Sequence, residues 1–305
     1  MEEGRFIEIR GKQLYVEISG ERQKNVILYL HGGPGEGCFD FTYHQLERFG
    51  NDFCVVAFDQ RGTLRSEEID VHEPFGLDDL IEDCEGLRCY FGIDKWSVIG
   101  HSFGGYLALL YASRYPDSIE KVVFEGPTFD FRLTAKSLLK KTAGLCAEYE
   151  LFDVQERCLS LIRNSSIRTR ELVEGYMEER EYLGDNRMRV YTYNFADLAD
   201  TSVYTDAEWD LFYERSEVHY NRLRDEGRIF KNVLPLLKEL SMPCLLIMGE
   251  HDAVPCPIQM DAFQIDVRLG ETYIVRECGH TPHYEAADEF YKVVCGFLKG
   301  ERKDE

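Results

Sequence analysis

A serine between two glycines is the residue whose setting most clearly indicates chemistry in this chain. The motif G-H-S-F-G at residues 100–104 lies between a strand-like run at 96–99 and a helix-like run at 103–115. Glycines on both sides of Ser102 permit a sharp turn that exposes the serine hydroxyl above a sheet. Because such a motif arises by chance only about 0.1 times in a chain of this length, we expect Ser102 to be a catalytic nucleophile.

A nucleophilic serine needs a base to take its proton and an acid to hold that base in position. Asp252 and His280 follow the serine in that order, each a few residues after a strand-like run. Serine, acid, histidine is the chain order of the α/β-hydrolase fold. We therefore expect His280 to act as the general base and Asp252 to orient it.

Neighbouring residues compete for both roles. Glu250 and His251 adjoin Asp252, but Asp252 lies furthest into the loop after the strand and is the preferred acid. His283 lies three residues after His280, and a glycine gives a free turn immediately before His280. His280 is therefore the preferred base.

The negative oxygen that forms during acyl transfer requires backbone N–H donors that are already in position. One donor comes from the residue after the nucleophile, here Phe103, and the other from the loop after the third strand. The glycine-rich turn H-G-G-P-G at residues 31–35 follows such a strand-like run. Gly33 or Gly32 is therefore the second expected donor, since Pro34 has no N–H.

A metal site is the main alternative for the C-terminal part of the chain. Residues of the ligand type gather there, namely His251, Asp252, Cys256, His280 and His283. Neither an H-E-x-x-H motif nor a closely spaced cysteine pair accompanies them. The ten cysteines are scattered and lie mostly in apolar segments, which predicts buried free thiols. We expect no metal and no other cofactor.

Strand-like and helix-like segments alternate through most of the chain, which predicts an α/β fold with a mostly parallel sheet and helices on both faces. Strand-like runs nearly vanish in the middle, where charged helix-like stretches at 171–182 and 206–224 take over. We therefore predict a catalytic core of residues 1–126 and 236–305, with a helical cap at 127–235 inserted between core strands. Such a cap would cover the carboxyl ends of the strands, where ligands bind.

The 305-residue chain has a formal net charge of −21. Nucleic acids and anionic membranes are not expected as partners, because binding them depends on clustered Lys and Arg. No apolar run approaches the length of about 18 residues that indicates a membrane span. The N-terminal M-E-E-G lacks the basic-then-apolar order of a signal peptide, so we expect a cytoplasmic protein. These features leave its oligomeric state open.

Several motifs together resemble the proline iminopeptidase family of α/β-hydrolases. They are H-G-G-P-G at 31–35, D-Q-R-G at 59–62 with Ser66, G-H-S-F-G-G at 100–105, and the terminal Asp252 and His280. The first two motifs are much more specific than the serine motif alone. The resemblance covers most of the predicted core. It implies hydrolysis of an N-terminal residue from a peptide, or of a related amide or ester, with a small-molecule or short-peptide substrate and no cofactor.

Three departures from the family pattern affect the expected specificity. Phe103 stands where the family usually has tryptophan, and Leu64 stands where it has the second glycine of D-Q-R-G-x-G-x-S. The family binds the α-ammonium group of its substrate with two cap glutamates. The resemblance assigns one of these to Glu217, whereas Asn194 lies near the position expected for the other.

Two other functions stay open on the same fold. An esterase, lactonase or amidase would keep the core and use its lid for another substrate. A non-catalytic binding module is the third hypothesis, because fold alone does not define function, but the intact set of serine, aspartate and histidine argues against it.

Overall fold

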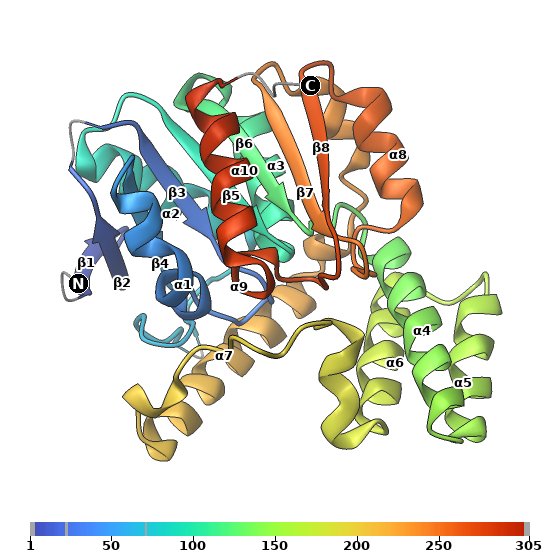
Figure 1. Cartoon of the computed structure of the whole chain (residues 1–305). Coiled ribbons are helices and arrows are strands. Elements are labelled where there is room, and N and C mark those ends of the chain that lie inside the picture. The colour runs from blue at the N-terminus through green and yellow to red at the C-terminus, as the bar shows by residue number, and fades with distance from the viewer. Residues whose placement is uncertain (1–3, 22–23, 71, 302–305) are drawn as a thin grey trace.

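Eight strands form one mostly parallel sheet in the computed structural model, which describes residues 4–21, 24–70 and 72–301 (Figure 1). Their order across the sheet is β1-β2-β4-β3-β5-β6-β7-β8. Pairing is antiparallel at β1–β2 and β2–β4 and parallel at the other junctions. The strands are β1 (Arg5–Ile9), β2 (Lys12–Ser19), β3 (Val26–Leu30), β4 (Cys54–Phe58), β5 (Trp96–His101), β6 (Ile119–Glu125), β7 (Cys244–Gly249) and β8 (Gly270–Val275).

Four of the inner strands are buried along their whole length. Every residue of β3, β4, β5 and β7 is buried, as expected for unbroken apolar runs in a sheet covered on both faces. Leu30 at the end of β3 pairs with Gly100 of β5, and His101 of β5 pairs with Glu125 of β6. Because parallel strands end at one edge of the sheet, the turns after β3 and β5 meet there.

Helices cover both faces of the sheet (Figure 1). One face packs on α2, α3 and α8 through an apolar core that includes Trp96 and Phe263, and the other packs on α1 and α10 through a core that includes Phe41 and Phe290. The predicted fold class is therefore confirmed. The elements outside the segment between β6 and β7 are α1 (Phe39–Gly50), α2 (Leu77–Phe91), α3 (Phe103–Arg114), η1 (Pro116–Ser118), α8 (Pro257–Asp266), α9 (Pro282–Glu285) and α10 (Ala287–Lys299).

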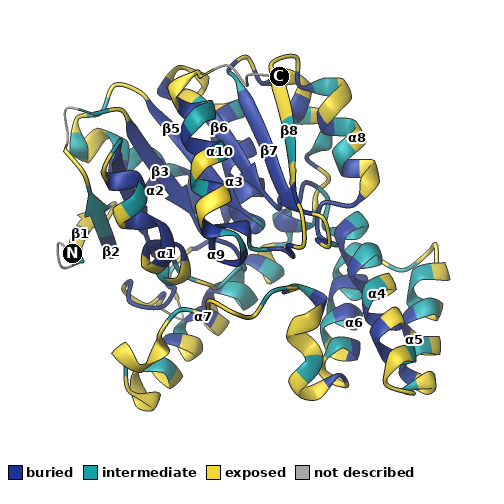
Figure 2. Ribbon diagram, in the orientation of Figure 1, coloured by how far each residue is buried: buried dark blue, intermediate teal, exposed yellow. Residues whose placement is uncertain are grey.

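The segment between β6 and β7 contains only helices as regular elements in the described residues. Helices α4, α5 and α6 share a small apolar core of their own, whose members include Leu139, Cys146 and Leu172. Much of the outer surface of this segment is exposed (Figure 2). Helices α6 and α7 match the two predicted helices, whereas α4 and α5 were not predicted individually. The elements are α4 (Phe131–Glu148), α5 (Phe152–Arg163), α6 (Thr169–Glu181), η2 (Gly184–Val190), η3 (Thr201–Val203), α7 (Asp206–Glu226), η4 (Arg228–Phe230) and η5 (Leu234–Glu239).

The cysteines test the prediction of buried free thiols. All ten cysteines are free, and every one except Cys89 is buried, so the predicted buried thiols are confirmed with that one exception.

No helix in the described ranges is long and apolar enough to cross a bilayer. Residues 1–3, most of the stretch considered for a signal peptide, lie outside the described residues.

Candidate active site

Ser102 lies in the turn between β5 and α3, with backbone angles φ 54° and ψ −115°. A positive φ is strained in a residue other than glycine and is typical of functional turns. The flanking glycines are needed for space, since a Cβ at Gly100 would lie 2.3 Å from the Gly104 oxygen, and a Cβ at Gly104 would lie 2.0 Å from the Leu30 oxygen. The Ser102 N–H donates to the Glu125 carbonyl at 2.9 Å, which ties the turn to the end of β6.

The structure brings His280 and Asp252 together on the loops after β8 and β7. His280 Nδ1 lies 3.0 Å from Asp252 Oδ2, and Asp252 Oδ1 accepts from the Val254 N–H at 2.8 Å. Burial by itself lowers the pKa of His280, but the charge and hydrogen bond of Asp252 outweigh it, so the pKa is raised. The carboxylate therefore favours the tautomer with the proton on Nδ1, which leaves Nε2 free to accept a proton.

The residues that compete for these two roles, Glu250, His251 and His283, contact other groups. Glu250 is exposed, and its carboxylate accepts a hydrogen bond from a backbone N–H at 3.3 Å. His251 is exposed and stacks on Tyr193 with ring centroids 4.1 Å apart. His283 Nδ1 lies 2.9 Å from Glu125 Oε1. None of these three side chains takes part in the hydrogen bond between Asp252 and His280.

The His283–Glu125 pair is a second buried histidine–carboxylate pair that the sequence did not predict. His101 Nδ1 lies 3.6 Å from the other Glu125 oxygen, and the rings of His101 and His280 are 4.7 Å apart. His101, Glu125 and His283 offer potential metal-ligand atoms within 4.8 Å of one another, a different set from the one considered in the sequence. Glu125 Oε1 accepts from the backbone N–H of His283 and lies 2.9 Å from its Nδ1, whereas Glu125 Oε2 and His101 Nδ1 form no hydrogen bond with another described group.

The glycine-rich turn after β3 faces the serine turn. A Cβ at Gly32 would lie 3.2 Å from the Ser102 Cβ, and Gly33 lines the same cavity as Ser102. The N–H groups of Gly33 and Phe103 take part in none of the turn and loop hydrogen bonds that the described backbone forms. Phe103 begins α3, where the first N–H groups of a helix have no partner within it. Both amides are therefore available to an oxygen atom beside Ser102.

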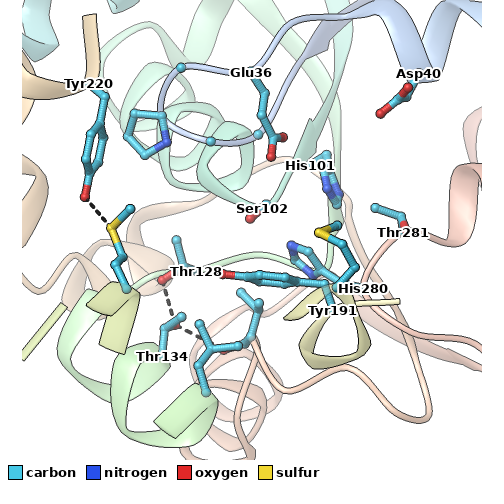
Figure 3. A pocket seen from close by; sticks show the side chains of 18 of the residues that line it. Glu36, Asp40, His101, Ser102, Thr128, Thr134, Tyr191, Tyr220, His280 and Thr281 are labelled. Atoms are coloured by element: carbon cyan, nitrogen blue, oxygen red, sulfur yellow. Dashed lines mark hydrogen bonds between the residues drawn. The ribbon is translucent and has the colours of Figure 1, made fainter. Parts of the chain in front are cut away.

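Ser102 and His280 line a cavity of about 560 Å³ (Figure 3). This volume lies within the range of roughly 300–1,000 Å³ typical of small-molecule sites. Its walls come from the core loops and from α4, α6 and α7. Apolar or aromatic side chains that line it include Phe131, Leu138, Val173, Tyr176, Met177, Tyr191, Tyr213, Tyr220 and Val254, and the acidic ones are Glu36, Asp40 and Glu217.

Helix α7 carries Glu217 to this cavity and is attached to the D-Q-R-G loop. Leu64 N–H donates to Ser216 Oγ at 3.3 Å, and His219 Nδ1 donates to the Arg61 carbonyl at 2.7 Å. Leu64, which replaces the family's glycine, adopts φ 38°. The sequence did not reveal that this loop holds the helix. Glu217 itself is exposed to the cavity, without a hydrogen bond or ion pair to another described group.

Among the described residues that line the cavity, no second glutamate comes from the stretch around Asn194. That asparagine is not among the described residues that line the cavity, and its side chain donates to the Glu285 carbonyl at 3.2 Å. Glu36 and Asp40 line the cavity instead, and neither was predicted from the sequence. The signal for Glu36 was its position directly after the H-G-G-P-G turn, which was expected to face the nucleophile.

Comparison with known proteins agrees with this geometry. Residues 25–287 match the family model described as the alpha/beta hydrolase fold. The chain is 35% identical over 285 residues to a proline iminopeptidase of Neisseria gonorrhoeae, with 88% of this chain and 86% of the relative covered. It is 38% identical over 266 residues to a proline iminopeptidase of Xylella fastidiosa, at 81% and 80% coverage. The crystal structure of a proline iminopeptidase from Mycobacterium smegmatis has a TM-score of 0.70 at 19% identity, covering 98% of each chain.

The chain therefore belongs to the α/β-hydrolase family and, within it, to the proline iminopeptidase group. It is an enzyme, a serine hydrolase. The family resemblance inferred from the motifs around Ser102 and the glycine-rich turn is confirmed.

Proposed function

We propose that this enzyme hydrolyses its substrate through an acyl-enzyme formed on Ser102. His280 Nε2 takes the hydroxyl proton while Ser102 Oγ attacks the substrate carbonyl carbon, and Asp252 stabilises the imidazolium that results. The N–H groups of Phe103 and Gly33 bind the oxyanion. His280 then gives the proton to the leaving amine. A water molecule, deprotonated by the same histidine, hydrolyses the ester and regenerates the serine.

The proposed substrate is a short peptide or related small molecule that loses its N-terminal residue. The names of the Neisseria and Xylella relatives support this activity. The observation that carries it in the structure is the charge of the cavity around Ser102. Three acids, Glu36, Asp40 and Glu217, line the described part of the cavity, against Arg180 as its one Lys or Arg side chain. Such a cavity favours a cationic group on the substrate.

The helical segment at 127–235 acts as a lid over the catalytic core in this proposal. Its helices supply the aromatic wall of the cavity, including Tyr176 from α6 and Tyr220 from α7. The α4–α6 core is separate from the cores on the two faces of the sheet. Lids of this kind exclude water from the reaction and select the substrate.

An esterase, lactonase or amidase is the second candidate function. It is favoured first by Asn194, whose side chain is hydrogen-bonded to the Glu285 carbonyl and which stands in place of a second cap glutamate that would line the cavity. A mostly apolar cavity also suits an uncharged acyl group. In this alternative the triad and the oxyanion donors act in the same way, and only the recognition of the substrate differs.

Substrate rates distinguish the two functions. Purified enzyme is given aminoacyl aryl amides, their N-acetylated counterparts, and aliphatic esters and lactones. An aminopeptidase should show a kcat/KM at least tenfold higher for free-amino amides than for the N-acetylated forms, because only the free amine gains the charge contact. Preference for N-blocked amides, or for lactones and simple esters with no cleavage of free-amino amides, would establish the second candidate.

A further inference from the structure

Glu36 is a carboxylate of the core, whereas Glu217 belongs to the lid. Glu36 follows the glycine-rich turn after β3, and its side chain lines the cavity, enclosed by protein but in contact with the open space inside it. Figure 3 shows its carboxylate directed toward the open space that the Ser102 hydroxyl also faces. The turn holds the residue close to the nucleophile, because a Cβ on Gly35 would lie 2.9 Å from the Ser216 carbonyl oxygen of α7, which leaves the turn little freedom to move outward.

Distances from Gly32 show how near the Glu36 carboxylate lies to Ser102. A Cβ at Gly32 would lie 2.8 Å from Glu36 Oε2 and 3.2 Å from Ser102 Cβ. The carboxylate oxygen and the serine Cβ therefore both lie within about one van der Waals contact of the same point beside Gly32. In an N-terminal residue the α-nitrogen is two bonds from the carbonyl carbon that Ser102 attacks. A group that binds this nitrogen must lie as near to the serine as Glu36 does.

Glu36 has no cationic partner within the described protein. It takes part in no hydrogen bond or ion pair between described groups. Desolvation of the carboxylate by the surrounding protein raises the pKa of Glu36, and the charge of Asp40 adds to this effect. Arg180, which also lines the cavity, is paired with Glu181 at 3.0 Å. A carboxylate in this position is stabilised by a cation that enters the cavity with the ligand.

We propose that Glu36 binds the α-ammonium group of the substrate and so selects substrates with a free N-terminal amine. This inference rests on the aminopeptidase function proposed above and names the core residue that recognises the amine. Glu36 is a specificity-determining residue here and takes no part in proton transfer. The family's pattern of two cap glutamates is thus replaced by one acid from the lid and one from the core.

The variant Glu36→Gln tests this role because it keeps the size of the side chain and removes its charge. The matched substrates are L-proline 4-nitroanilide, which carries the amine, and 4-nitrophenyl cyclopentanecarboxylate, which has the same ring without it. We expect kcat/KM for the anilide to fall about 30-fold or more, as for loss of a desolvated charge pair. The ester rate should change less than about threefold, and it also reports that the variant is folded. Glu8→Gln, on an exposed position of β1, is the control for loss of one negative charge.

A second measurement reports whether Glu36 is electrostatically close to the catalytic histidine. The charge of Glu36 contributes to the raised pKa of His280, after the larger effects of burial and Asp252. In Glu36→Gln the acid limb of ester hydrolysis should therefore move to lower pH. In Glu8→Gln it should stay where it is.

The outcomes separate this inference from the proposed function. If the unmutated enzyme cleaves the anilide but Glu36→Gln lowers anilide and ester rates equally, or lowers neither, Glu36 does not bind the amine and the aminopeptidase function stands. If the unmutated enzyme cleaves the ester and no free-amino amide, both the aminopeptidase function and this role of Glu36 are overturned.

Discussion

The two walls of the active-site cavity are built in different ways. The core wall, with Ser102 and the glycine-rich turn, is fixed by close backbone approaches that leave no space for a Cβ at Gly100 or Gly104. The helical wall consists of long side chains on α6 and α7, such as Tyr220, whose hydroxyl donates to the Met177 sulfur at 2.9 Å. The difference agrees with the proposed division of roles, in which the core wall carries out the reaction and the substrate is selected by the helical wall together with Glu36 of the core wall.

The largest expected effect comes from the core wall. Ser102→Ala removes the proposed nucleophile, so turnover should fall by a factor of about 10⁶ for every substrate class. A fluorophosphonate probe should label Ser102 in the native enzyme and leave the variant unlabelled. Native, folded enzyme that is not labelled would show that the reaction does not use this serine.

Loss of the Asp252 charge, which orients His280, should give the next largest effect. Asp252→Asn keeps the side-chain shape but loses the charge that holds His280 in the required tautomer, and we expect turnover to fall by about 10⁴. The matched control is Glu250→Gln, on the exposed neighbour two residues earlier, which should retain nearly full activity. If the control proves the more damaging change, Glu250 is the orienting acid.

The helical wall should affect one substrate class only. Glu217→Gln removes a carboxylate of α7 from the cavity, and kcat/KM for free-amino substrates should fall about 30-fold. Hydrolysis of simple esters should hardly change, because the core wall is intact. Equal losses for both classes would contradict the division of roles between the walls.

The pH profile gives the smallest and most selective effect. His280 must be neutral to accept a proton, and its pKa is raised above the ordinary value of 6.5 in the folded enzyme. Activity should therefore be lost as pH falls through a value above 6.5, and kcat/KM measured against pH should show this acid limb. Glu217→Gln should leave the limb in place. A limb below 6.5 in the unmutated enzyme would show that Asp252 does not control the charge of His280.

The sequence predicted the elements of the core well because their signals are local. Unbroken apolar runs predicted the buried strands, and the motif around Ser102 predicted the turn whose backbone angles the structure shows. Asp252 and His280 were selected by chain order and loop position, and the structure brings them within 3.0 Å. The assignment of catalytic roles to these residues stays a prediction until the variants are measured.

The features that the sequence did not predict depend on contacts between distant residues. Glu125 and His283 are 158 positions apart and pair only because β6 and α9 meet. The sequence places Glu36 directly after the glycine-rich turn, but the direction of its side chain depends on how that turn folds. Helices α4 and α5 pack on each other and on α6, so their positions follow from a shared core that no single segment reveals.

The attachment of α7 to the D-Q-R-G loop has a consequence for how such an enzyme changes over generations. Two of its contacts join side chains of the helix, Ser216 and His219, to main-chain atoms of Leu64 and Arg61. Main-chain atoms persist when a side chain is exchanged, provided that the new residue tolerates the φ of 38° at position 64. The loop itself has little freedom to change, because Arg61 and Arg65 form buried ion pairs with Asp83 and Asp59. The exposed positions of α7 are not bound in this way, so they can vary toward new substrates while the inherited chemistry is kept.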